Sequence, residues 1–150
     1  MVIGAAQVAV VLAVVFLGID LHAAHPLAVV GLTVLTSATF VAILHLLAAR
    51  LGSVGKFLGL VLLVLQLVSA GGTFPWQTLP LPLHALHHVL PMGYAIDGLR
   101  HLMYGGSLTS VGRDVAVLMA YLLLALAGSS ATARRARVWT ASRVKPELVL

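Results

Sequence analysis

The stretch that decides the fold is QLVSAGGTFPWQTLPLPLHALHHVLPMGYAIDGLRHLMYGG, which covers residues 66–106. Apolar segments lie on both sides of it, and it holds most of the Pro and His residues of the chain. Proline and paired glycines interrupt helices, because proline lacks a backbone N–H and glycine leaves helical dihedrals without steric cost. The stretch therefore predicts a patterned break between two apolar helices.

The composition around this break is typical of membrane proteins. Of the 150 residues, 61% are hydrophobic and 9% are charged, and the mean hydropathy is +1.09, more than a soluble domain of this size could bury. Cysteine is absent, which excludes disulfides, thiolate metal sites and cysteine nucleophiles. The chain has four acidic residues and neither a nucleophile-elbow nor a P-loop motif. We therefore expect no enzyme, no metal site and no cofactor.

Four apolar segments are expected to cross the bilayer as helices, which takes about 20 residues each. The third is long enough only if it continues through Gly71 and Gly72 toward Pro75. The predicted fold is an all-α membrane protein with four transmembrane helices and short external re-entrant or amphipathic helices between the third and fourth. The predicted spans are 2–19, 27–49, 57–74 and 112–132, within a membrane region at 1–133 that includes an external segment at 75–111 and precedes a basic tail at 134–150.

The positions of the cations predict the orientation. Arg50 and Lys56 flank the connection between the second and third segments, and five of the nine Lys and Arg residues follow Ala133. Because cytoplasmic loops are enriched in Lys and Arg, we expect a multi-pass protein with both termini in the cytoplasm. The net charge of +5 then indicates a tail that faces anionic lipid head groups, and we expect no nucleic-acid partner.

Residues 90–106 have the amphipathic pattern of a second helical element. Pro91 suits its first turn, and Gly105 and Gly106 suit its end. Asp97 can pair with Arg100 or His101 at helical spacing, although such a pair contributes little when it is exposed. One predicted face carries Ile96, Leu99 and Met103, and the other carries Asp97, Arg100, His101 and Tyr104.

Two amides and three histidines are the other polar residues to place. Gln7 and Gln66 lie inside apolar segments, where an amide is expected to face another helix, as interhelical hydrogen-bonding residues or as part of a substrate path. His84, His87 and His88 fall on one helical face. A zinc enzyme would need a further ligand and a nearby carboxylate base, which this window lacks, so the pattern favours hydrogen-bonded interfacial histidines.

The break also carries a family resemblance. The run GKFLGLVLLVLQLVSAGGTFPWQTLP followed by LPMGYAIDGLRHLMYGG resembles the C-terminal membrane region of the YhgE/Pip (phage infection protein) family, relatives of type-2 ABC exporter permeases. The chain is similar to this family over about 55–106, where both motifs occur in order at the family's spacing. Over 1–54 and 107–133 the agreement is mainly in hydropathy.

The resemblance implies a bacterial cell-membrane protein whose short external helices dip toward the membrane before the last span. It implies a permease subunit, homo- or heterodimeric, that moves substrate outward with energy from a separate ATPase. It also implies that a further N-terminal span and a large extracellular domain are missing from this chain. The alternative is a non-transporting anchor or scaffold for phage adsorption or type VII-like secretion.

The family motifs assign roles to named residues of the break. Asp97 and Arg100 match the family's DGLR and are expected to form either a helix-packing pair or a gating contact. The residues expected to shape the break and the re-entrant motif are Gly71, Gly72, Thr73, Phe74, Pro75, Pro91, Gly105 and Gly106.

Overall fold

The structure is a computed structural model that describes residues 2–18, 23–71 and 81–139. Within these ranges the chain is helical and contains no strand, which agrees with the predicted all-α class. Helix α1 passes directly into a π-helical segment at Val14–Gly18. The helices are α1 (Val2–Ala13), α2 (Pro26–Leu51), α3 (Ser53–Ser69), α4 (Leu81–Val89), α5 (Pro91–Tyr104) and α6 (Leu108–Trp139).

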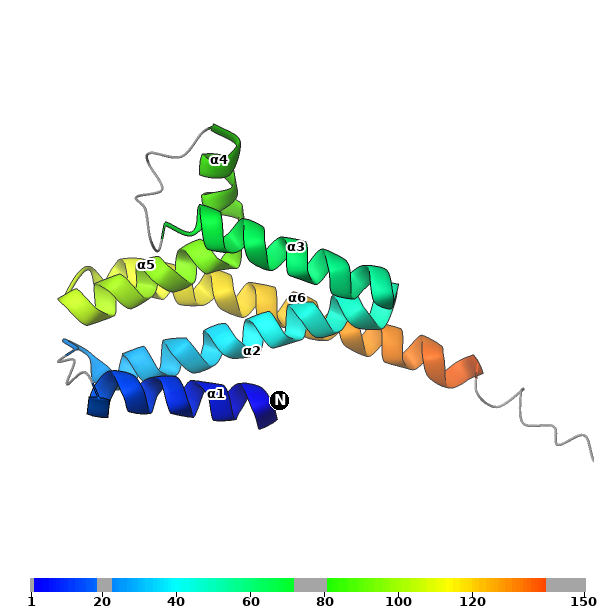
Figure 1. Ribbon diagram of the computed structural model, residues 1–150, viewed down its shortest axis with the longest axis horizontal. Helices are drawn as coiled ribbons and strands as arrows, with labels where there is room; N and C mark the ends of the chain where they lie inside the picture. The colour runs from blue at the N-terminus through cyan, green and yellow to red at the C-terminus, as the bar shows by residue number, and fades with distance from the viewer. Residues whose placement is uncertain (1, 19–22, 72–80, 140–150) are drawn as a thin grey trace, which may run out of the picture.

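Helices α2 and α6 form the centre of the bundle and run in the same direction (Figure 1). The buried Thr39 hydroxyl lies between them and donates to the Leu118 carbonyl at 3.3 Å and to the Leu35 carbonyl, one turn earlier in α2, at 2.8 Å. Near the C-terminal end of α2, Arg50 donates to the Thr132 hydroxyl at 3.2 Å. The apolar core lies where α2 and α6 begin and consists of Val29, Leu32, Ala95, Leu102, Val111 and Leu118.

In the part of the chain that the structure describes, two helices are long and apolar enough to cross a membrane. They are the whole of α2 and the Leu108–Ala133 part of α6. The apolar parts of α1 and α3 are shorter, at Gly4–Leu17 and Ser53–Ser69. Two spans therefore follow from length and composition, whereas the predicted count of four stays a prediction.

Helix α3 packs antiparallel on α2 through glycines. Gly52, with φ of 58°, makes the turn between the two helices. A Cβ atom on Gly55 would overlap the Leu47 carbonyl, and one on Gly59 would lie 2.7 Å from the Leu44 side chain. These small residues let the two backbones approach closely, as in the small-xxx-small pattern of membrane helices.

Helix α3 begins and ends earlier than the sequence predicted. It starts at Ser53 because the turn at Gly52 is complete there, and it ends at Ser69. The expected continuation through Gly71 is wrong, because Gly71 has φ of 70° and has left the helix. At 1.5 Å per residue, the 17 residues of α3 cover about 25 Å, against about 39 Å for the 26 residues of α2.

Helix α5 occupies the space along α2 that α3 leaves open. Figure 1 shows α4 standing away from the bundle at the end of α3, while α5 lies along the remaining part of α2. The Leu102 carbonyl accepts from the His25 N–H at 3.1 Å, which places the end of α5 beside the start of α2. Pro91 is the first residue of α5, and Gly105 caps its end with φ of 74°.

The face of α5 that packs on the core includes Leu99 and Met103 of the predicted apolar face. The fully buried residues beside them are Ala95, Gly98 and Leu102, while Ile96 is half-buried. Gly98 allows close packing, because a Cβ atom on it would lie 2.8 Å from the Leu32 side chain. A small residue, which hydrophobicity does not single out, therefore marks the contact.

Helix α6 extends beyond both ends of its predicted span. It begins at Leu108, within the segment expected to be external, and continues to Trp139. The first residues of the predicted tail at 134–150 are thus helical. Residues 140–150 lie outside the described ranges.

Candidate functional site

A polar network lies where α3 ends, among otherwise apolar helices. The last carbonyls of any helix lack partners within the helix and carry partial negative charge. Here the Ser69 carbonyl contacts His87 Nδ1 at 3.1 Å, and the Gly71 carbonyl accepts from Arg100 Nη2 at 2.5 Å. Because a carbonyl oxygen only accepts, His87 Nδ1 carries the hydrogen. The C-terminal end of α3 is therefore held by a side chain from α4 and another from α5.

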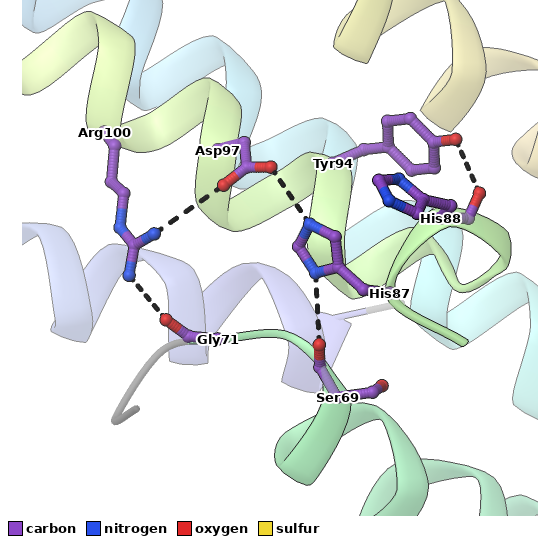
Figure 2. A network of polar contacts seen from close by, with 7 residues as sticks. All are labelled: Ser69, Gly71, His87, His88, Tyr94, Asp97 and Arg100. Carbon is purple, nitrogen blue, oxygen red and sulfur yellow. Dashed lines mark hydrogen bonds and ion pairs between the residues drawn. The ribbon is translucent and has the colours of Figure 1, made fainter. Parts of the chain in front are cut away.

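Asp97 joins these two side chains, as Figure 2 shows. Its Oδ2 lies 3.3 Å from His87 Nε2 and its Oδ1 lies 3.7 Å from Arg100 Nη1. The His87 side chain is buried, at 4% exposed, whereas Asp97 and Arg100 are 35% and 46% exposed. The network thus runs from a buried imidazole to a half-exposed ion pair and connects α3, α4 and α5.

Two tyrosines fix the connection between α4 and α5. The Tyr94 hydroxyl donates to the His88 carbonyl at 2.7 Å, and the Tyr121 hydroxyl of α6 donates to the Val89 carbonyl. A Cβ atom on Gly93 would lie 2.5 Å from the His87 carbonyl, so a glycine is needed for this close approach. These contacts hold His87 against Asp97.

Buried polar groups beside the network have no hydrogen-bond partner among the described residues. Both amide atoms of Gln66 and the Ser69 hydroxyl are in this state, and the two residues are 1% and 0% exposed. They lie one turn apart on the buried face of α3. Unpaired polar groups of this kind are rare in helical interiors and are often found at functional sites.

The comparison with known proteins decides the family. Residues 1–104 match the family described as ABC-2 type transporter. The chain belongs to this ABC-2 type transporter family. It is also 35% identical over 127 residues to "Uncharacterized protein YhgE" of Bacillus subtilis (strain 168), a match that covers 85% of this chain and 16% of that protein. No solved structure matches it.

The family assignment confirms the predicted resemblance to YhgE/Pip proteins and to type-2 ABC permeases. It also makes the chain a component of a membrane transporter, located in a membrane. The chain spans 16% of the length of the Bacillus subtilis relative. The activity of a longer protein is therefore a matter for proposal.

The ABC-2 chain brings together some of the predicted site residues. Asp97 and Arg100 are within ion-pair distance, and the Gly71 carbonyl joins them through Arg100. Gly105 caps α5, and the Gly106 N–H donates to the His101 carbonyl at 2.7 Å. The predicted residues Gly72, Thr73, Phe74 and Pro75 lie outside the described ranges.

The predicted amides and histidines differ in burial in the structure. Gln66 is buried, whereas Gln7 lies on the exposed side of α1. His87 points into the network, and His88 is exposed, with its ring edge-on to that of His87 at 5.2 Å. The backbone of His84 belongs to α4, but its side chain lies outside the described part.

Sequence reasoning missed two features of this ABC-2 chain. The contact of His87 with Asp97 crosses the Pro91 turn, and helical spacing does not predict pairs across a turn. The glycines that seat α3 on α2 could have been found, because Gly55 and Gly59 are four residues apart in an apolar segment.

Proposed function

We propose that this chain is the membrane-embedded part of a permease in a type-2 ABC exporter-like system. It moves a hydrophobic or amphipathic substrate, or a polypeptide, outward, and a separate ATPase supplies the energy. The observation that carries the proposal is the polar network of His87, Asp97 and Arg100 at the point where α3 stops partway along α2. Transporters commonly place their working sites at such interrupted helices.

The proposal includes a re-entrant arrangement of α4 and α5. Four spans are formed by α1, α2, α3 and α6, and both termini lie in the cytoplasm. Arg50 and Lys56 mark the inner side by the positive-inside rule. Backbone that is irregular at membrane depth needs cover from protein or water. The contacts of Arg100 and His87 with the carbonyls of Gly71 and Ser69 support such cover.

Within this permease, the network acts as the gating contact. Asp97 and Arg100 lie on α5, and their partners lie on α4 and at the end of α3. When these contacts form, they hold the C-terminal end of α3 against α4 and α5. When they break, α5 is free to move relative to α3. Ionisable residues inside apolar helical segments are few because they are unfavourable there, which makes these the residues to test first.

Lipid and a second subunit cover the outward faces in this proposal, so the working unit is a homo- or heterodimer. The outward face of α3 is strongly apolar, and Phe57, Leu60 and Leu67 are each more than 60% exposed in the single chain. Apolar area of this extent is covered in a membrane protein by acyl chains or by another helix.

The test is capture of the full-length protein with its energy source. The protein is purified from its own membranes in mild detergent, and co-purifying ATPases are identified by mass spectrometry. Reconstituted vesicles are then assayed for ATP-dependent movement of a fluorescent amphipathic substrate. An ATPase subunit and ATP-dependent export are expected. Repeated capture without an ATPase, together with absent export, would contradict the proposal and favour a scaffold.

A further inference from the structure

Asp114 is a buried carboxyl that the polar network does not use. It lies on α6, within the Leu108–Ala133 segment that is able to cross a membrane, and it is 7% exposed. Among the described residues, none forms a hydrogen bond or an ion pair with its carboxyl. An ionisable group within a membrane-spanning helix has an unfavourable transfer free energy and generally marks a functional site.

The packing of α5 places Asp114 against a glycine. A Cβ atom on Gly98 would lie 3.5 Å from Asp114 Oδ2 and 2.8 Å from the Leu32 side chain. The carboxyl therefore faces α5 at Gly98, with an apolar residue of α2 beside the same glycine. The charged or titratable groups that act on it are Asp97 and His101 of α5 and Arg113 of α6.

The neighbouring carboxylate, Asp97, contacts other residues of the polar network. Asp97 places one oxygen 3.3 Å from His87 Nε2 and the other 3.7 Å from Arg100 Nη1, so both of its oxygens face side chains of the network. No described residue donates a hydrogen bond to Asp114, and the groups that act on it are the like charge of Asp97 and, with opposite and smaller effects, His101 and Arg113. A carboxyl buried without a partner takes up a proton, because an isolated buried charge is far more costly than a neutral acid.

We propose that the Asp114 carboxyl is a proton-binding site that is loaded while α5 packs on α6 and unloaded when the two helices separate. Water that enters the opened interface accepts the proton: the O–H bond of the acid breaks, the carboxylate remains and hydronium forms. The coupling to movement rests on the proposed function, in which α5 moves. A falling pH then favours the packed state, and a rising pH favours the separated state.

Infrared spectroscopy of the full-length protein in lipid nanodiscs tests the bound proton directly. At neutral pH the wild-type protein is expected to show the C=O stretching band of a protonated carboxylic acid. Asp114→Asn should lose this band and Asp114→Glu should shift it. The matched change Asp97→Asn should keep it. A spectrum that Asp114→Asn leaves unchanged would overturn the proposal. If Asp114→Asn does not fold, Asp114→Glu is compared instead, and an unshifted band would overturn it.

Two further measurements complete the test. One distinguishes a bound proton from a bound metal cation, and the other tests the link between the proton and helix movement. At constant pH the band should be independent of sodium concentration; its loss as sodium is added would make Asp114 a cation site and overturn the proposal. In a complex trapped with ATP, the band should weaken, and an undiminished band would refute the link to helix movement. The bound proton is measured without any transport assay, so failure of the permease proposal is distinguishable from failure of this one.

Discussion

Gly55 sets how closely α3 approaches α2. A Cβ atom at this position would overlap the Leu47 carbonyl, which belongs to helical backbone and cannot rotate away. Gly55→Val should therefore push the two helices apart and lower the free energy of unfolding by about 1–3 kcal/mol. Unfolding in SDS, followed by circular dichroism, measures this loss.

Gly31 provides the matched control for Gly55. It lies on an exposed side of α2, and a Cβ atom there would meet nothing within 4 Å. Gly31→Ala should be neutral or stabilise the protein by about 0.5–1 kcal/mol, because alanine favours the helix. If Gly55→Val lost no more stability than Gly31→Ala, the close approach at Gly55 would not determine how α3 packs on α2.

His87 should matter more for stability than its neighbour His88. His87→Ala leaves the buried Ser69 carbonyl without its donor and removes one partner of Asp97. An unsatisfied buried acceptor costs about 1–3 kcal/mol, which SDS unfolding would reveal. The His88 side chain is exposed, and His88→Ala keeps the backbone carbonyl that Tyr94 uses, so this change should cost less stability than His87→Ala. The reverse order would place the stabilising contact at His88.

At the scale of single residues, the sequence predicted neighbours along a helix better than neighbours across a turn. Asp97 and Arg100 are three residues apart, so helical spacing alone places them together. His87 lies ten positions before Asp97 in another helix, and only the Pro91 turn brings it back. Gln66 was expected to face another helix, and it is buried, but its amide has no partner in the described part of the chain.

Helices α4 and α5 should be the elements most sensitive to loss of the network. Arg100→Gln removes the donor to the Gly71 carbonyl and one partner of Asp97. Because both ion-pair members are partly exposed, the global stability should change little. The amides of α4 and α5 should instead exchange with deuterium faster, since local opening becomes easier.

The control for this exchange experiment is Arg50→Gln. Arg50 donates to Thr132 near the C-terminal end of α2, far along the bundle from the network. Its loss should leave the exchange of α4 and α5 unchanged. If Arg50→Gln and Arg100→Gln increased exchange in α5 equally, the network could not be what holds α5 in place.

For whole elements, hydrophobic length predicted helices well and their ends less well. The predicted 27–49 segment is contained in α2. The apolar run is uninterrupted, and Pro26 favours the first turn of a helix, so the start of α2 could be predicted. For α3 the predicted 57–74 segment was displaced, since Gly52 makes the turn and Ser53 already starts the helix. For α5, Leu99 and Met103 of the predicted apolar face pack against the core, whereas Gly98 contributes to packing by being small, which hydropathy does not register.

At the scale of the whole molecule, composition alone indicated a membrane protein, and the family match confirms a transporter component. The relation of α3 to α5 could not be predicted in the same way. Sequence shows that α3 is short, but only the contacts of Ser69 and Gly71 show that side chains from α4 and α5 hold its end. Those contacts join residues up to 29 positions apart.

In the proposed topology, the chain crosses the bilayer between the start of α3 and the start of α6, although α3 alone is too short. Because the chain contains no native cysteine, single cysteines at the exposed positions Ser53 and Thr109 can be labelled in intact cells with a membrane-impermeant maleimide. The Thr109→Cys protein should react from outside, and the Ser53→Cys protein should react only after the membrane is permeabilised. Reaction of both cysteines from the same side would show that the chain does not cross the bilayer between Ser53 and Thr109.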